Sequence, residues 1–170
     1  MKDPLYFKPE LLASKGQRFA NLIVDLIFRV VLMFLFGLVA GLLALFGSDG
    51  LLVWITEIGT LGEQILGWTL MLIYYTVMEA TTQRTIGKYI SGTKVVMEDG
   101  SKPTIGTVLL RSLCRLIPFE AFSFFGDPSR GWHDTITNTY VIDVNRYKHA
   151  EMLENSFNEI GSDINNLHNG

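Results

Sequence analysis

The chain has 170 residues, enough for one domain of ordinary size, and 48% of them are hydrophobic. Its formal net charge of −3 arises entirely after residue 142, so the remainder is balanced and nothing indicates a nucleic-acid partner. The single cysteine, Cys114, excludes an internal disulfide and a cysteine-based metal cage, and the histidines are too scattered for a ligand set, so we expect no cofactor and no metal site.

The first long apolar stretch predicts a helix over residues 14–46. Residues 30–46 carry no charge, and the extension back to Arg18 is long enough to cross a hydrocarbon core of about 30 Å. Ser14 and Gln17 have the spacing of a capping box at its start. Residues 1–13 lack the features of a cleavable signal peptide and are interpreted as a cytoplasmic arm, so we expect an uncleaved anchor.

Polar residues interrupt the first half of this helix. Arg18, Asp25 and Arg29 fall on roughly one face, which we expect to contact protein or trapped water because a charge facing lipid is costly. Asp25 and Arg29, four positions apart, have the spacing of an ion pair. Gly37 and Gly41 form a GxxxG pair for helix packing, which fits either an internal partner or a second copy of the chain.

A second apolar helix is predicted over residues 62–82, after a loop over 47–61 with at most a short interfacial turn. Near its end, Glu79 lies on a polar face. We interpret this carboxylate either as a partner of Arg29 or Arg84, or as a helix-end group wetted at the lipid headgroups.

Lysine and arginine are distributed unevenly around the two predicted helices. They occur before the first helix and after the second, but the loop between the helices has none. By the positive-inside rule, the N-terminus and the segment after the second helix are predicted to be cytoplasmic. We therefore expect a multi-pass protein of the inner (plasma) membrane.

The second half of the chain is more broken. A strand and turn are predicted over 93–103, followed by a helical segment over 105–125 that Pro118 interrupts. Such a segment is expected to be re-entrant or interfacial and to require protein cover over its backbone. Its basic stripe, Arg111 and Arg115, is interpreted as binding lipid phosphates or as pairing with acids inside the fold, and we favour internal pairing for at least one of them.

A short motif and a strand are predicted over residues 131–144. His133, beside Asp134, is interpreted as an interfacial residue next to Trp132, and the strand over 139–144 is expected to pair with 93–97. Residues 145–170 form an acidic polar C-terminal tail with weak helical character.

Three blocks of the sequence together resemble the RDD family of membrane proteins. They are RFANLIVD from Arg18, TIGKYISGTKVV from Thr85, and GWHD from Gly131. The family is named for one arginine and two aspartates, which Arg18, Asp25 and Asp134 match, and the similarity spans residues 18–144. The resemblance implies a membrane protein with a role in transport, some members being linked to sodium–proton exchange.

We therefore expect an all-α helical membrane protein with two transmembrane helices, a broken re-entrant or interfacial segment and a small cytoplasmic β element. The predicted charge cluster comprises Arg18, Asp25, Asp134, Arg29 and Glu79, supported by Arg111, Arg115, Trp132 and His133. It is expected to exchange a small, sodium-type cation for protons in a homo-oligomer, or else to clamp the fold of a non-transporting scaffold. Neither interpretation makes the protein an enzyme.

Overall fold

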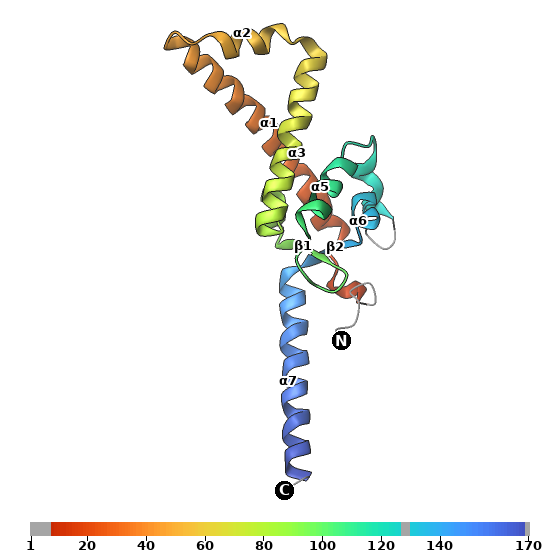
Figure 1. Cartoon of the computed structure of the whole chain (residues 1–170). Helices are drawn as coiled ribbons and strands as arrows, with labels where there is room; N and C mark the ends of the chain where they lie inside the picture. The colour runs from red at the N-terminus through yellow and green to blue at the C-terminus, as the bar shows by residue number, and fades with distance from the viewer. Residues whose placement is uncertain (1–7, 127–129, 169–170) are drawn as a thin grey trace.

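The computed structural model describes residues 8–126 and 130–168. Two long helices, α1 (Lys15–Leu45) and α3 (Gly59–Thr82), diverge like the arms of a V and are joined at the open end by α2 (Gly50–Glu57) (Figure 1). The prediction of a loop over 47–61 is therefore wrong for its middle part, which is helical, and the helix predicted from residue 62 begins three residues earlier.

The start of α1 is fixed by the capping box that the sequence predicts. The Ser14 hydroxyl accepts a hydrogen bond from the Gln17 backbone N–H (3.2 Å), and the Gln17 side chain accepts one from the Ser14 N–H (2.9 Å). These two bonds satisfy backbone donors that the first helical turn leaves unpaired.

Helix α1 is polar on its buried face and apolar on its exposed face. Its buried residues are Arg18, Asn21, Asp25 and Ala40. In its most apolar stretch of 18 residues, only 6% is buried inside the molecule. The core helix of a soluble protein shows the opposite arrangement. Among the described residues, α1 is the one helix long and apolar enough to cross a membrane; α3 has the length but is less apolar, so a second crossing remains a prediction.

A small antiparallel sheet lies at the start of α1. Strand β1 (Thr93–Met97) pairs with β2 (Thr139–Asp143), which confirms the predicted pairing, and α4 (Ile86–Ile90) leads from α3 into β1. The chain before α1 reaches the sheet through η2 (Pro9–Leu11) and a backbone bond from Ala13 N–H to the Val141 carbonyl (2.9 Å). The sheet therefore anchors the end of α1 that carries the polar residues.

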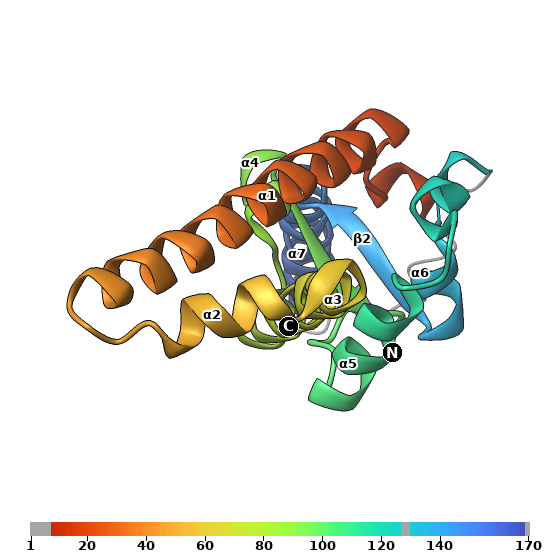
Figure 2. The same cartoon turned by 90° about the horizontal axis from the view of Figure 1, so that it is seen from above.

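The segment predicted as one broken helix over 105–125 consists of two separate elements. Helix α5 (Ile105–Cys114) packs against α3, and the 3-10 helix η3 (Glu120–Phe125) contacts α1 and α6 (Trp132–Ile136) (Figure 2). In the turn between them, Phe119 adopts a left-handed conformation with φ of 66°. The Trp-His-Asp motif, which the sequence places ahead of a strand, itself forms the short helix α6.

After β2 the chain continues as one helix, α7 (Val144–His168), which extends away from the rest of the molecule (Figure 1). The acidic tail is thus helical as far as the structure describes it.

Candidate functional site

The carboxylate of Glu79 on α3 is fully buried and contacts three cations. Its Oε1 accepts from Lys88 Nζ (3.0 Å) and Arg115 Nη2 (2.7 Å), and its Oε2 accepts from Arg111 Nε (3.1 Å). The predicted pairing with Arg29 or Arg84 and the solvated alternative are both wrong, because the end of α3 faces α4 and α5. Charge-assisted bonds on both oxygens compensate for the loss of water around this group.

The carboxylate of Asp134 on α6 is also fully buried and joins two arginines. Its Oδ2 accepts from Arg18 Nη1 (2.6 Å) and its Oδ1 from Arg111 Nη1 (2.7 Å). The structure thus brings together Arg18 and Asp134, which lie far apart in the sequence. Burial by itself would raise the pKa of Asp134, but Arg18, followed by His133 and Arg111, holds that pKa well below its ordinary value.

Arg111 is the centre of this network. It is completely buried, bridges Glu79 to Asp134, and also contacts the Thr139 hydroxyl on β2. Arg115, the residue that follows the last one of α5, lies over the ring of Tyr75, 4.2 Å from the ring centre to the guanidinium carbon. Internal pairing, which we expected for at least one of these arginines, occurs for both. The network ties α1, α3, α4, α5 and α6 together, and we call it the clamp: Arg18, Glu79, Lys88, Arg111, Arg115 and Asp134.

Asp25 lies next to the clamp but is bound differently. Its Oδ2 accepts from the Thr85 hydroxyl (2.7 Å), and its Oδ1 accepts from the Gly87 N–H (2.9 Å) and the Tyr74 hydroxyl (3.1 Å). All three donors are neutral. Within the described residues Asp25 has no ion pair, so its predicted pairing with Arg29 is wrong.

The close approach of α4 to Asp25 depends on Gly87. A Cβ placed at this position would lie 2.6 Å from the backbone oxygen of Asn21 and 3.0 Å from Asp25 Oδ1. The backbones of α1 and α4 could make room for this Cβ only if the two helices moved apart. Glycine is therefore required here by the packing rather than by an unusual backbone angle.

Arg29 lies one turn beyond Asp25 and makes no hydrogen bond, ion pair or ring contact with any described residue. Its guanidinium rests against α3 where Gly67 leaves room: a Cβ on that glycine would lie 3.3 Å from Arg29 Nη2. Arg29 is thus the cation of the predicted cluster that the clamp does not include.

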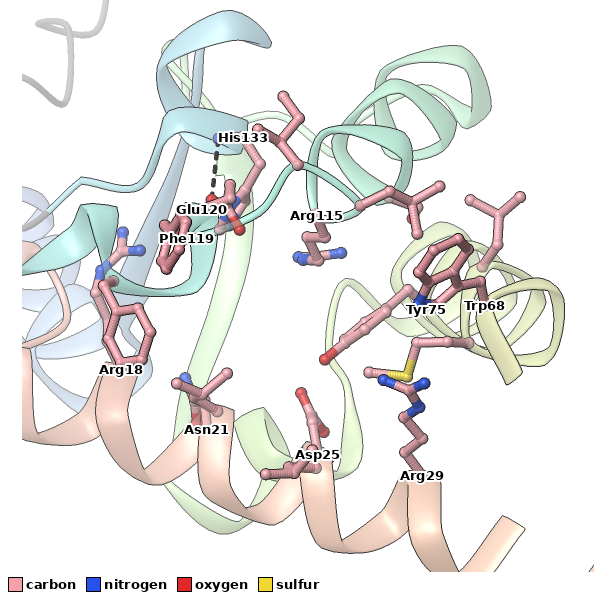
Figure 3. A pocket seen from close by; sticks show the side chains of 18 of the residues that line it. Arg18, Asn21, Asp25, Arg29, Trp68, Tyr75, Arg115, Phe119, Glu120 and His133 are labelled. Carbon is pink, nitrogen blue, oxygen red and sulfur yellow. Dashed lines mark hydrogen bonds and ion pairs between the residues drawn. The ribbon is translucent and has the colours of Figure 1, made fainter. Parts of the chain in front are cut away.

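A cavity of about 430 Å³ separates the residues of α1 from those of α5 and η3. Figure 3 shows Asp25 and Arg115 pointing into it from opposite walls, with Arg29 beside Trp68 at one end and Arg18 near Phe119 at the other. The cavity therefore has both charges and apolar surface in its wall.

His133 and Glu120 form part of the same wall. The Nδ1 of His133 contacts Glu120 Oε1, as the dashed line in Figure 3 marks. Burial lowers the pKa of the His133 imidazole below its ordinary 6.5, in spite of the neighbouring Asp134 carboxylate. The His133 side chain is 13% exposed, whereas the adjacent Trp132 is 49% exposed, and a place for His133 at the membrane interface remains a prediction.

Gly37 and Gly41, predicted as a helix-packing pair, lie toward the far end of α1. Neither has a described atom within 4 Å of where its Cβ would lie, so no helix of the described chain packs on them. Packing against a second copy remains a prediction.

The sequence reasoning did not identify Lys88, Tyr74, Thr85 or Gly87 as site residues. The signal was available, because three of the four fall in or beside the TIGK sequence that opens the second RDD-like block.

Comparison with known proteins gives one result that bears on this site. The family model described as the RDD family matches residues 12–138 and so includes Arg18, Asp25 and Asp134. No curated protein and no solved structure matches the chain.

Proposed function

The chain belongs to the RDD family of membrane proteins, and from this premise we propose that it exchanges a small, sodium-type cation for protons, with Asp25 as the exchanging carboxylate. The observation that supports this proposal is the contrast between Asp25 and the clamp carboxylates. Glu79 and Asp134 are each held by at least two cations, whereas Asp25 is held by neutral donors alone. A buried carboxylate in a spanning helix that has no permanent counter-charge is the group best suited to bind a proton and a cation in turn.

The neighbours of Asp25 suit such an exchange chemically. A hydroxyl group both donates and accepts, so Tyr74 and Thr85 can donate to the ionised carboxylate or turn their oxygens toward a bound cation. Sodium, like other hard cations, prefers oxygen ligands. The cavity gives Asp25 a route of access that the clamp carboxylates do not share.

The proposal is tested with purified protein in lipid vesicles that enclose a pH-sensitive dye. A pulse of NaCl should change the internal pH for the wild type and leave it unchanged for Asp25→Asn. Glu63→Gln removes an exposed carboxylate from the other long helix and should keep the flux. Flux that persists in Asp25→Asn would exclude Asp25 as the exchanging group.

A second candidate function is supported by the clamp itself. Its ion pairs join five elements and leave both of its carboxylates fully bonded, as expected for a scaffold that holds a fixed fold. Under this alternative, wild-type vesicles show no flux, and Asp25→Asn lowers only thermal stability or abundance. The same vesicle experiment therefore separates the two functions.

We further propose that α1 and α3 both cross the inner membrane, that both chain ends are cytoplasmic, and that the protein is a homo-oligomer. The charge distribution and the two glycines open on α1 support these proposals. A reporter fused to the C-terminus should be active only in the cytoplasm, and cross-linking in mild detergent should give a species larger than the monomer, lost in a Gly37→Ile, Gly41→Ile variant.

A further inference from the structure

Arg29 lies immediately before the uncharged part of α1, and no described residue supplies it with a counter-charge. It is eleven residues beyond Arg18, which places it about 16 Å farther along the helix axis. An arginine at such a depth is normally paired, yet no described residue bonds to its guanidinium. The neighbouring acid, Asp25, already accepts three hydrogen bonds from other residues.

A second arginine, Arg115, also lines the cavity. Arg115 binds Glu79 through Nη2, but its Nη1 is buried and has no hydrogen-bond partner among the described residues. Figure 3 shows the guanidinium of Arg115 directed into the cavity from the α5 side, while Arg29 enters it from α1. Arg115 Nη1 is a buried donor without a partner, and Arg29 is a cation without a counter-charge, so an anionic acceptor near the two side chains would be favourable.

The charges around the cavity leave an excess of one cation. The described clamp and cavity wall hold five cations (Arg18, Arg29, Lys88, Arg111, Arg115) against four carboxylates (Asp25, Glu79, Glu120, Asp134), with His133 neutral because burial lowers its pKa. One monoanion bound near Arg29 would restore the balance.

The rim of the cavity near these two arginines is apolar and open to the outside. Leu26 and Trp68 lie beside Arg29, and Leu116 and Ile117 follow Arg115; all four line the cavity, and each is at least 42% exposed. On a membrane protein these surfaces face acyl chains rather than water. A ligand with both a charged and an apolar part would match this wall better than a free anion.

We propose that the cavity binds the phosphate group of an anionic lipid between Arg29 and Arg115, with the acyl chains lying over the apolar rim. Guanidinium groups bind phosphate oxygens through charge-assisted hydrogen bonds, and such a group would supply the counter-charge that Arg29 lacks. The proposed lipid is a different ligand from the cation exchanged at Asp25, although both lie at the same cavity.

The test measures lipid retained by the purified wild-type protein in native mass spectrometry. The probes are phosphatidylglycerol, phosphatidylcholine and inorganic phosphate at equal concentrations. We expect one retained phosphatidylglycerol, at roughly tenfold greater occupancy than phosphatidylcholine, and a loss of about tenfold in Arg29→Gln. Arg84→Gln is the matched control, because that guanidinium lies over the ring of Tyr89 (5.2 Å) and does not line the cavity, and it should retain the lipid as the wild type does.

A second variant tests the other wall. Arg115→Lys keeps a positive charge toward Glu79 while removing the guanidinium, and should also lower phosphatidylglycerol retention by the folded protein. Equal retention of the two lipids, or unchanged retention in Arg29→Gln, would overturn the proposal. Inorganic phosphate displacing the lipid at equal concentration would assign the site to free anions and overturn the lipid assignment. No ion gradient is used, so failure here leaves the exchange proposal standing.

Discussion

Replacing Arg111 by methionine tests the clamp most directly. This side chain is completely buried and contacts Glu79 at 3.1 Å and Asp134 at 2.7 Å, from two different elements. Removing one partner of a buried ion pair costs about 3–5 kcal/mol, because the charge left behind has no water to solvate it. Since Glu79 keeps Lys88 and Asp134 keeps Arg18, we expect a loss near the lower limit, about 3 kcal/mol.

The assay is chemical denaturation in detergent micelles, which reports the free energy of unfolding. Arg84→Met is the control for the same change outside the clamp and should alter it by less than about 0.5 kcal/mol. Combining Arg111→Met with Asp134→Asn should cost less than the sum of the single variants, by about 1–3 kcal/mol, because both remove the same contact. Single-variant losses that simply add, or a loss below about 1 kcal/mol for Arg111→Met, would refute the central position given to this arginine.

Three further predictions use the same unfolding assay. Gly87→Ala should cost about 1–3 kcal/mol, since its Cβ would lie 2.6 Å from the Asn21 backbone oxygen, whereas Gly37→Ala, with no described atom within 4 Å, should be tolerated. The free energy of unfolding should fall as the pH drops below 6.5, because burial lowers the pKa of His133 and the unfolded chain then takes up a proton before the folded chain does; a His133→Gln variant that keeps the same slope would contradict this. Ser14→Ala removes the N-cap of α1 and should cost about 1 kcal/mol, while an unchanged midpoint would show that the capping box contributes nothing.

The sequence predicted the structure correctly where the energetic cost of every alternative arrangement is high. A charge in an apolar helix must turn inward, so the buried face carrying Arg18 and Asp25 could be predicted without any knowledge of its partners. The same holds for the pairing of β1 with β2, because two short strand patterns flanked by turns had few alternatives.

Partner choice could not be predicted, because it depends on how the helices are rotated against one another. From the sequence alone, several cations are possible partners of Glu79. Only the packing of α5 on α3 determines that Arg111 and Arg115 are the ones that bind it. Lys88 was missed for a related reason: a lysine in a short turn is ordinarily solvated, and only its place between α1 and α3 buries it. The helical state of residues 50–57 could not be predicted because the segment is short: eight residues, five of them large and apolar, show no decisive periodicity.

The inward-facing polar stripe of α1 has a consequence for biogenesis. Asp25 finds Thr85 and Gly87 within about sixty residues of synthesis, but Arg18 must wait for Asp134, which follows 116 residues later. At ordinary translation rates that interval is on the order of ten seconds. During this interval α1 carries an arginine that has no carboxylate partner. We therefore expect α1 to stay near the lipid headgroups or with the insertion machinery until the carboxyl-terminal half of the chain emerges. Nascent chains halted before residue 134 should be the ones that quality-control proteases remove.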